Sequence, residues 1–166
     1  GQPLPVTVFL GGPPALMLAA IAPLPEDVPE LVLASLLAGQ KLKMTRNPLG
    51  AEKHRLAAEA EFALVGHIPP HERRPEGPFG DHTGFYTMED LYPVFHVTCV
   101  THRKDPIYAT TIVGKPPMED AWMGRAVARI FLPLMRLTIP EIIDVNLPIE
   151  GVFHNLVFVS IKKTYP

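Results

Sequence analysis

The stretch from Pro75 to Asp81, which reads P-E-G-P-F-G-D, constrains the local fold more than any other part of the chain. Two prolines and two glycines stand there beside two carboxylates. Proline lacks a backbone N–H, and glycine adopts conformations that other residues avoid, so neither a regular helix nor a central strand tolerates this composition. The stretch is therefore predicted to be a shaped loop that holds Glu76 and Asp81 in place.

Two carboxylates on a stiffened loop fit more than one interpretation. They can be a general acid–base residue and its partner, or they can be solvated turn residues, and spacing alone does not decide. A third possibility is a two-carboxylate hydrolase such as a glycosidase, which needs an aromatic-rich sugar cleft. The chain has one Trp and no cluster of aromatic residues, which argues against a glycosidase.

Composition excludes several other classes. The chain has 166 residues, of which 47% are apolar, enough for a globular domain with a core. A net charge of −2 gives no electrostatic basis for binding nucleic acid or an anionic membrane. A single cysteine, Cys99, excludes an internal disulfide, and no run approaches the roughly 20 apolar residues of a membrane span. A reducing, cytoplasmic setting is expected.

Hydrophobic patterns predict short strands and three helices. The predicted strands cover residues 6–10, 41–44, 60–68, 94–103, 107–113, 141–147 and 156–161, and the predicted helices cover 15–21, 29–38 and 118–137. Asp27 is a candidate cap for the second helix, and Pro133 is expected to kink or end the third. Strands 94–103 and 107–113 are predicted to form a hairpin through Asp105 and Pro106. This order favours an antiparallel sheet or barrel carrying helices, an α+β fold.

Individual side chains on these elements are assigned as follows. The predicted buried residues are Trp122, Val127, Ile130, Phe131, Leu134, Phe158 and Ile161. The aromatic residues among them could instead line a pocket. Gly11 and Gly12 before the first helix fit a tight turn or a phosphate site. His96 and His102 are interpreted as ordinary strand residues, because the seven histidines show no metal-ligand spacing.

Five sequence pieces occur in an order that resembles the UbiD family of flavin-dependent decarboxylases. They are A-E-F-A-L-V-G from Ala60, E-R-R-P-E-G-P-F-G-D-H-T-G-F-Y from Glu72, P-V-F-H-V-T from Pro93, T-H-R-K-D-P-I-Y from Thr101 and V-G-K-P-P from Val113. The P-E-G-P-F-G-[DE] core is specific. The resemblance covers nearly the whole chain.

The resemblance implies a mainly β (α+β) fold, the second half of a flavin-binding split β-barrel with about three packed helices. Residues 1–166 would then form a single UbiD-like split-barrel domain and be a fragment of a longer chain. The first half of the barrel, expected before Gly1, carries an Asn and a His that bind metal and an Arg that pairs with the catalytic Glu. The chain alone is therefore expected to be inactive.

The resemblance also implies a reaction, the reversible decarboxylation of an aromatic or α,β-unsaturated carboxylic acid of hydroxybenzoate type. Departing carbon dioxide leaves a carbanion, which needs an electron sink that no side chain supplies. In the family that sink is prenylated FMN, and some members serve ubiquinone biosynthesis. Glu76 matches the catalytic Glu that protonates the reacting carbon, and Asp81 matches the second acid of the motif. A non-catalytic flavin-binding or subunit-interaction module is the alternative.

Glu30 is the residue to which the UbiD resemblance assigns a metal site. Taken by itself, a first-turn Glu complements the helix dipole. In the family, however, a Glu after the P-x-P segment binds a divalent metal, Mn²⁺ or Mg²⁺, beside the flavin phosphate, and backbone carbonyls near Ala19, Ala22 and Glu30 bind K⁺. Pro23, Ala22 and Glu30 would contact the cofactor, and oxygen ligands of this kind suit hard cations. A homo-oligomer, or an assembly with the rest of the enzyme, is also expected.

Overall fold

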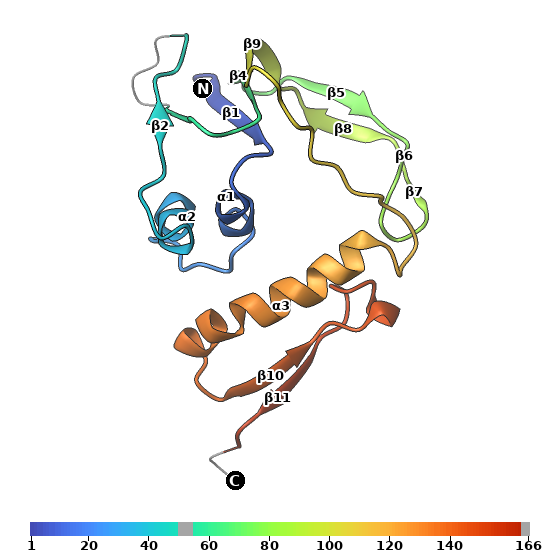
Figure 1. Ribbon diagram of the computed structural model, residues 1–166. Coiled ribbons are helices and arrows are strands. Elements are labelled where there is room, and N and C mark those ends of the chain that lie inside the picture. The colour runs from blue at the N-terminus through green and yellow to red at the C-terminus, as the bar shows by residue number, and fades with distance from the viewer. Residues whose placement is uncertain (50–54, 164–166) are drawn as a thin grey trace. The chain divides into compact units, whose positions relative to one another are not determined.

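The computed structural model describes residues 1–49 and 55–163, which form two compact units. Unit 1 comprises Gly1–Glu76 and Glu89–Ala109, and unit 2 comprises Gly77–Met88 and Thr110–Pro166. Figure 1 labels their helices and strands. The expectation of a single split-barrel domain over residues 1–166 stays a prediction.

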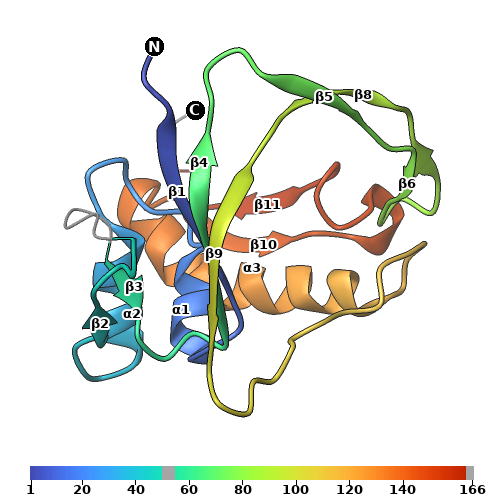
Figure 2. The ribbon, with the colours of Figure 1, turned by 90° about the horizontal axis from the view of Figure 1, so that it is seen from above.

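Unit 1 is built on a three-stranded antiparallel sheet of β1 (Leu4–Leu10), β4 (Phe62–Ile68) and β9 (His96–His102). β4 lies in the middle, between β1 and β9 (Figure 2). Alternate residues of β4, Ala63 and Val65, are buried, as a strand with one covered face requires. The core of this sheet consists of Leu56, Ala63 and Val65, with Phe9 and Cys99 packed against it.

The pairing of β4 with β9 contains a bulge. Val65 pairs with Cys99, but the next residue, Gly66, pairs with Val97, so Thr98 is the extra residue on β9. The Thr98 hydroxyl donates a hydrogen bond of 3.2 Å to the Val65 carbonyl. A side chain therefore provides a donor where the bulge interrupts the backbone ladder.

Two short helices follow β1. Helix α1 (Pro14–Ala19) packs against α2 (Glu30–Leu37), and both are followed along the chain by β2 (Met44–Thr45), which pairs with β3 (Leu56–Ala57). α2 ends at Leu37 with Ala38 as its C-cap, and Gly39 follows with φ +64°. The N–H groups of Gly39 and Gln40 donate to the Leu36 and Ser35 carbonyls. A glycine with positive φ therefore follows the end of this helix.

The predicted cap at Asp27 is wrong. Pro29 occupies the N-cap position of α2, and no side chain caps the helix. Asp27 instead lies inside a turn closed by the bond from the Val28 N–H to the Pro25 carbonyl, 3.0 Å long. The helix therefore begins at Glu30, after Pro29, and Asp27 lies outside it.

Within the P-E-G-P-F-G-D stretch, Pro75 and Glu76 belong to one strand and Phe79 and Gly80 to another, so the prediction of a loop alone is partly wrong. β5 (Arg73–Glu76) pairs with β8 (Asp90–Pro93) in unit 1, and β6 (Phe79–Gly80) pairs with β7 (Tyr86–Thr87) in unit 2. Each is a two-stranded sheet, which has only edge strands, and an edge strand accepts a proline such as Pro75.

The predicted hairpin of residues 94–103 with 107–113 is also wrong. β9 pairs with β4, and residues 107–113 form no strand. The cause is Glu61, which is 9% exposed. Its carboxylate accepts bonds of 3.0 Å from Arg103 Nη1 and from the Ile107 N–H, so the chain after β9 is tied to the start of β4.

We expect Glu61→Gln to weaken this attachment. The amide keeps one acceptor oxygen but sets an NH₂ group against a donor, which leaves a buried group without its bond at a cost of ~1–3 kcal/mol. Hydrogen exchange at the Ile107 amide measures the effect. The matched control is Glu59→Gln, because the Glu59–Lys43 pair is exposed and should contribute less than ~0.5 kcal/mol. Equal hydrogen-exchange protection of the Ile107 amide in Glu61→Gln and Glu59→Gln would contradict this role of Glu61.

Unit 2 contains α3 (Glu119–Thr138), a short 3₁₀ helix η1 (Ile149–Gly151), and a sheet of β10 (Ile142–Asn146) and β11 (Phe158–Ile161). α3 packs on β10, as Figure 1 shows. Phe131 is 1% exposed, which confirms its prediction as core. The Arg129 guanidinium binds Asp144, and Arg136 Nε donates to the Ile142 carbonyl at 2.9 Å, so two arginines join the helix to the strand.

Several burial predictions for unit 2 are wrong. Trp122, Ile130, Phe158 and Ile161 are between 44% and 59% exposed. Trp122 lies on the outer face of α3, where its ring stacks with the Arg125 guanidinium. Among the described residues no further strand pairs with β11, which leaves its side chains uncovered. α3 continues past Pro133 to Thr138, so the helix does not end early there.

The fold is thus a mixed one of helices and small antiparallel sheets. The strands of the described residues form one three-stranded and four two-stranded sheets, and they do not close into a barrel. Within the same residues, no helix is both long enough and apolar enough to cross a membrane.

Candidate active site

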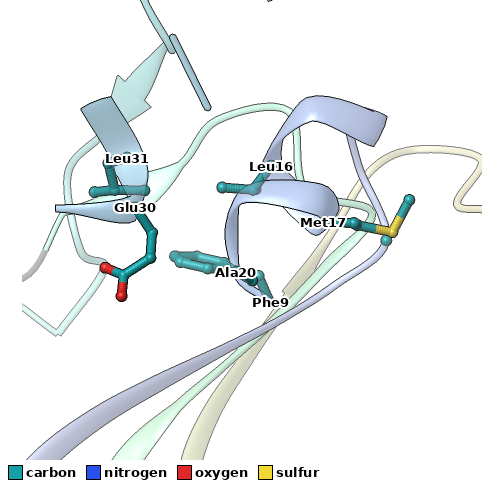
Figure 3. A pocket seen from close by; sticks show the side chains of 7 residues that line it. Phe9, Leu16, Met17, Ala20, Glu30 and Leu31 are labelled. Atoms are coloured by element: carbon teal, nitrogen blue, oxygen red, sulfur yellow. The ribbon is translucent and has the colours of Figure 1, made fainter. Parts of the chain in front are cut away.

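Glu30 lies at a pocket of unit 1. The pocket has a volume of about 500 Å³ and is lined by Phe9, Gly11, Leu16, Met17, Ala20, Glu30 and Leu31. Figure 3 shows Glu30 on the α2 side and Leu16 and Met17 on the α1 side. Glu30 provides the one carboxylate in an otherwise apolar lining. An exposed carboxylate in the lining of an apolar pocket can bind a cation or a polar end of a ligand.

The other residues implied for cofactor and cation binding lie at the end of α1 and in the segment that leads from α1 to α2. Ala19 is fully buried, Ala22 is half-buried and Pro23 is exposed. The Ala19 carbonyl accepts a bond from the Ala22 N–H at 3.2 Å, and the Ala22 carbonyl accepts one from Leu24 at 2.8 Å. A carbonyl has two lone pairs, so each keeps acceptor capacity for a cation. Over residues 1–49 and 55–163, no three His, Cys, Asp or Glu side chains gather as a metal site.

Gly11 and Gly12 serve close packing. Gly11 has φ +67°, and a Cβ there would lie 2.8 Å from the Glu61 Cγ. Pro13 and Pro14 follow and contribute no N–H donors to the start of α1. The tight-turn interpretation fits this geometry, whereas a phosphate site at a six-residue helix without these donors does not.

The two predicted catalytic carboxylates belong to different units. Glu76 ends β5 in unit 1, opposite Asp90 of β8, and its side chain is exposed. Asp81 follows β6 in unit 2 and is half-buried. The backbone holds Asp81 through bonds from its N–H to the Phe85 carbonyl and from the Gly84 N–H to its own carbonyl, 3.1 and 3.0 Å long.

Asp81 is part of a hydrogen-bonded chain of side chains. Its Oδ1 lies 2.6 Å from His82 Nδ1, and His82 Nε2 lies 3.1 Å from His154 Nε2. Burial raises the pKa of Asp81, but hydrogen bonds from His82 and its charge outweigh burial. The net pKa of Asp81 therefore lies below its ordinary value, and this carboxyl is ionised at neutral pH.

Sequence reasoning missed His82 and His154. His82 follows Asp81 directly, and that adjacency could have suggested a carboxylate–imidazole pair. His154 is 72 residues further along the chain, so no local pattern indicates the contact. His96 was interpreted as an ordinary strand residue, but its Nε2 lies 2.8 Å from Glu72 Oε2. This hydrogen bond to His96 is the main cause that lowers the pKa of Glu72.

Comparison with family models identifies the class of protein. The model of the 3-octaprenyl-4-hydroxybenzoate carboxy-lyase Rift-related domain, UbiD, matches residues 1–116, and that of the carboxy-lyase C-terminal domain matches residues 121–166. The chain therefore belongs to the UbiD family, which confirms the resemblance carried by the five motifs.

Individual relatives agree with this family. An uncharacterized protein of Archaeoglobus fulgidus is 52% identical over 100% of this chain and 34% of its own length. The UbiD-class enzyme HmfF from Pelotomaculum thermopropionicum, in an evolved dimeric form with prFMN, has a TM-score of 0.78 at 31% identity, covering 99% of this chain and 38% of that one. Vanillic acid decarboxylase of Sedimentibacter hydroxybenzoicus in its closed form has a TM-score of 0.84 at 27% identity, covering 99% and 34%. The chain spans about a third of the length of these relatives.

Proposed function

We propose that the complete protein containing this chain is a UbiD-type carboxy-lyase that reversibly decarboxylates an aromatic or α,β-unsaturated carboxylic acid. The observation that carries the proposal is the family match over residues 1–116 and 121–166 together with the P-E-G-P-F-G-D motif. The hydroxybenzoate type of substrate is supported by the family description and by the vanillic acid decarboxylase relative. A role in ubiquinone biosynthesis is part of the same proposal.

Glu76 would deliver the proton that replaces carbon dioxide. A carboxylic acid can do so when it lies within ~3 Å of the reacting carbon. Pro75 and the β5–β8 pairing limit the freedom of the backbone that carries Glu76, and such preorganisation favours proton transfer. Asp81 would be the second acid of the motif, ionised and hydrogen-bonded to His82.

The cofactor we propose is prenylated FMN, which would supply the electron sink that the carbanion requires. The pocket beside Glu30 fits such a group in chemistry, because its volume and apolar lining are typical of a cofactor site. Glu30 would bind Mn²⁺ or Mg²⁺, and the carbonyls near Ala19, Ala22 and Glu30 would bind K⁺. Ala22 and Pro23 would contact the cofactor itself.

The remaining parts of the proposal concern the whole protein. Residues of this chain would complete a flavin-binding split barrel with segments outside it. A homo-oligomer is supported by the dimeric form of HmfF. A cytoplasmic location and inactivity of residues 1–166 alone stay predictions.

The test is turnover by the purified complete protein loaded with prenylated FMN, Mn²⁺ and K⁺. We expect carbon dioxide release from a panel that includes 4-hydroxybenzoate and cinnamate, and deuterium at the former carboxyl carbon in heavy water. Bound cofactor without either signal over a broad panel of conjugated acids would reject the enzyme and favour the alternative, a non-catalytic flavin-binding or subunit-interaction module.

We expect Glu30→Gln in the complete protein to weaken retention of the divalent metal and of the flavin. A neutral amide is a poorer ligand for a hard cation than a carboxylate, so occupancy should fall by ~10-fold or more at limiting metal. Metal analysis and flavin absorbance after gel filtration measure both. Glu26→Gln is the matched control, since Glu26 is an exposed residue outside the pocket lining. Equal occupancy in the two variants would make Glu30 a helix-terminus residue only.

A further inference from the structure

A pocket of unit 2 lies between α3 and the end of β10, and its volume is about 390 Å³. Figure 1 shows α3 running along β10. Half of the lining residues come from α3 and half from the chain after Asp144: Arg125, Ala128, Arg129, Val145, Asn146 and Leu147. All of them belong to unit 2. Among the described residues, the lining therefore combines two guanidinium groups with apolar side chains and contains no carboxylate.

The Arg129 guanidinium forms a fixed part of this lining. It donates to the Asp144 carboxylate through Nη1 and to the Val145 carbonyl through Nη2. The Val145 N–H donates in turn to Asp144 Oδ1 at 2.8 Å. These bonds, the one from Arg129 first, hold the pKa of Asp144 below its ordinary value, so this carboxyl is ionised at neutral pH. The positive charge of Arg129 is therefore matched within unit 2.

The Arg125 guanidinium is oriented but has no partner of opposite charge. Its Cζ lies 5.2 Å from the centroid of the Trp122 ring, three residues earlier on the same side of α3. A guanidinium that lies over an aromatic ring still has N–H donors free in its own plane. Among the described residues, the Arg125 side chain forms no ion pair. The pocket therefore contains an oriented cation whose donors are available to a ligand.

The charges and the lining indicate what kind of ligand the pocket fits. Because Asp144 matches Arg129, one positive charge stays unmatched, and a carboxylate with a single negative charge neutralises it. A carboxylate also accepts two parallel bonds from one guanidinium. A phosphate monoester carries between one and a half and two negative charges at pH 7, which exceeds the unmatched charge. Ala128, Val145 and Leu147 offer contact to a short hydrocarbon chain.

We propose that this pocket binds the carboxylate of a small aliphatic acid, and that Arg125 makes the main contact with it. The inference does not rest on the proposed function, because a saturated acid has no conjugated system to take up the electrons left by carbon dioxide. The bound acid is thus a ligand and not a substrate. It would join α3 to the end of β10 and would stabilise that contact, as any ligand stabilises the conformation to which it binds.

The first test is equilibrium dialysis of the complete protein with ¹⁴C-butanoate at about 0.15 M ionic strength, where weak surface attraction is screened. We expect one saturable site per chain that depends on Arg125. Arg125→Gln should weaken binding at this site by ~10-fold or more, because a charge-assisted pair of hydrogen bonds is lost. Arg125→Lys keeps the charge but loses the planar fork, so its affinity should fall between those of the wild type and Arg125→Gln.

The matched control is Arg46→Gln, the same exchange at an exposed arginine of unit 1 outside this pocket. It should leave butanoate binding unchanged. Equal binding in Arg125→Gln and in the wild type would overturn the proposal, and so would equal weakening in Arg125→Gln and Arg46→Gln. Butyl phosphate that competes better than butanoate at the Arg125-dependent site would overturn the assignment to a carboxylate.

The second test locates the ligand by hydrogen exchange. With butanoate at ten times its dissociation constant, amides of α3 and β10 that exchange by separation of these two elements should gain ~10-fold protection. Butanamide has the same shape but no charge, and it should give no gain. Equal protection with the two compounds in the wild-type protein, or a butanoate gain that persists in Arg125→Gln, would overturn the proposal. Because the comparison of the two compounds uses the wild-type protein, it decides the question even where a variant folds poorly.

Discussion

Replacing Gly66 with Ala should disrupt the pairing of β4 with β9. A Cβ at this position would lie 1.9 Å from the His96 carbonyl oxygen and 2.9 Å from Phe95 Cε2. The first of these atoms belongs to the backbone of the neighbouring strand, so no rotamer change relieves the contact. The strands must separate or the bulge at Thr98 must shift, and overpacking of this kind costs ~3 kcal/mol. Hydrogen exchange at the amides of β4 and β9 in the complete protein measures the loss.

The control for this change is Gly114→Ala. A Cβ at Gly114 meets only the Met118 side chain, at an ordinary contact distance of 3.8 Å, so the effect should be within ~0.5 kcal/mol. The Gly66 effect should also be confined to β4, β9 and the strand β1 that pairs with β4. Unchanged protection of β4 in Gly66→Ala would show that the two strands are able to move apart at little cost.

The sequence predicts the elements of this chain better than their partners. Strand β4 follows from alternating small and apolar residues, and α2 from its periodicity and Gly39. The position of β9 next to β4 does not follow, because a hairpin with residues 107–113 satisfies the same local pattern. Glu61 decides between them through a contact with Ile107, 46 residues away. Contacts at such separation leave no trace in a local pattern.

The burial of individual side chains is also predicted only in part by local sequence patterns. The periodicity of α3 indicates Phe131 correctly but also includes Trp122, whose ring lies against Arg125 on the outer face. An apolar residue in a helix or strand is buried only where another element covers it. Phe158 on β11 is apolar and belongs to a strand, yet among the described residues no further strand pairs with β11. Strand propensity therefore predicts β11 but does not predict whether another element covers its side chains.

The candidate site was predictable to different degrees. The motif around Glu76 and Asp81 indicates the family from a handful of residues, because prolines and glycines at fixed spacing shape one backbone path. Glu30 was indicated only by its place after the P-x-P segment, and the structure adds the pocket that it lines. The roles of Glu30, Glu76 and Asp81 stay predictions. The contact of His154 with His82 could not be predicted from the sequence, because it depends on how unit 2 folds.

Glu76→Gln in the complete protein is expected to abolish turnover and leave the fold intact. After carbon dioxide departs, a proton must reach the same carbon, and bulk water is a poor donor inside a closed pocket. Gln keeps the size of Glu and part of its hydrogen bonding but has no acidic proton to give. Loss of a direct proton donor lowers kcat by at least ~100-fold. Measurement of kcat together with hydrogen exchange in β5 and β8 separates chemistry from stability.

The matched control is Glu89→Gln, the same exchange at an exposed residue of unit 1 beside β8. It should leave kcat unchanged. It should change stability, measured as hydrogen-exchange protection of β5 and β8, by no more than the ~0.5 kcal/mol of a surface substitution. Glu76 is also exposed and has no hydrogen bond to another side chain among the described residues, so stability gives no reason to expect a difference between the two variants. A large difference in kcat alone would then assign proton delivery to Glu76. Equal kcat would remove Glu76 from the mechanism and leave it as an edge-strand residue of the β5–β8 pair.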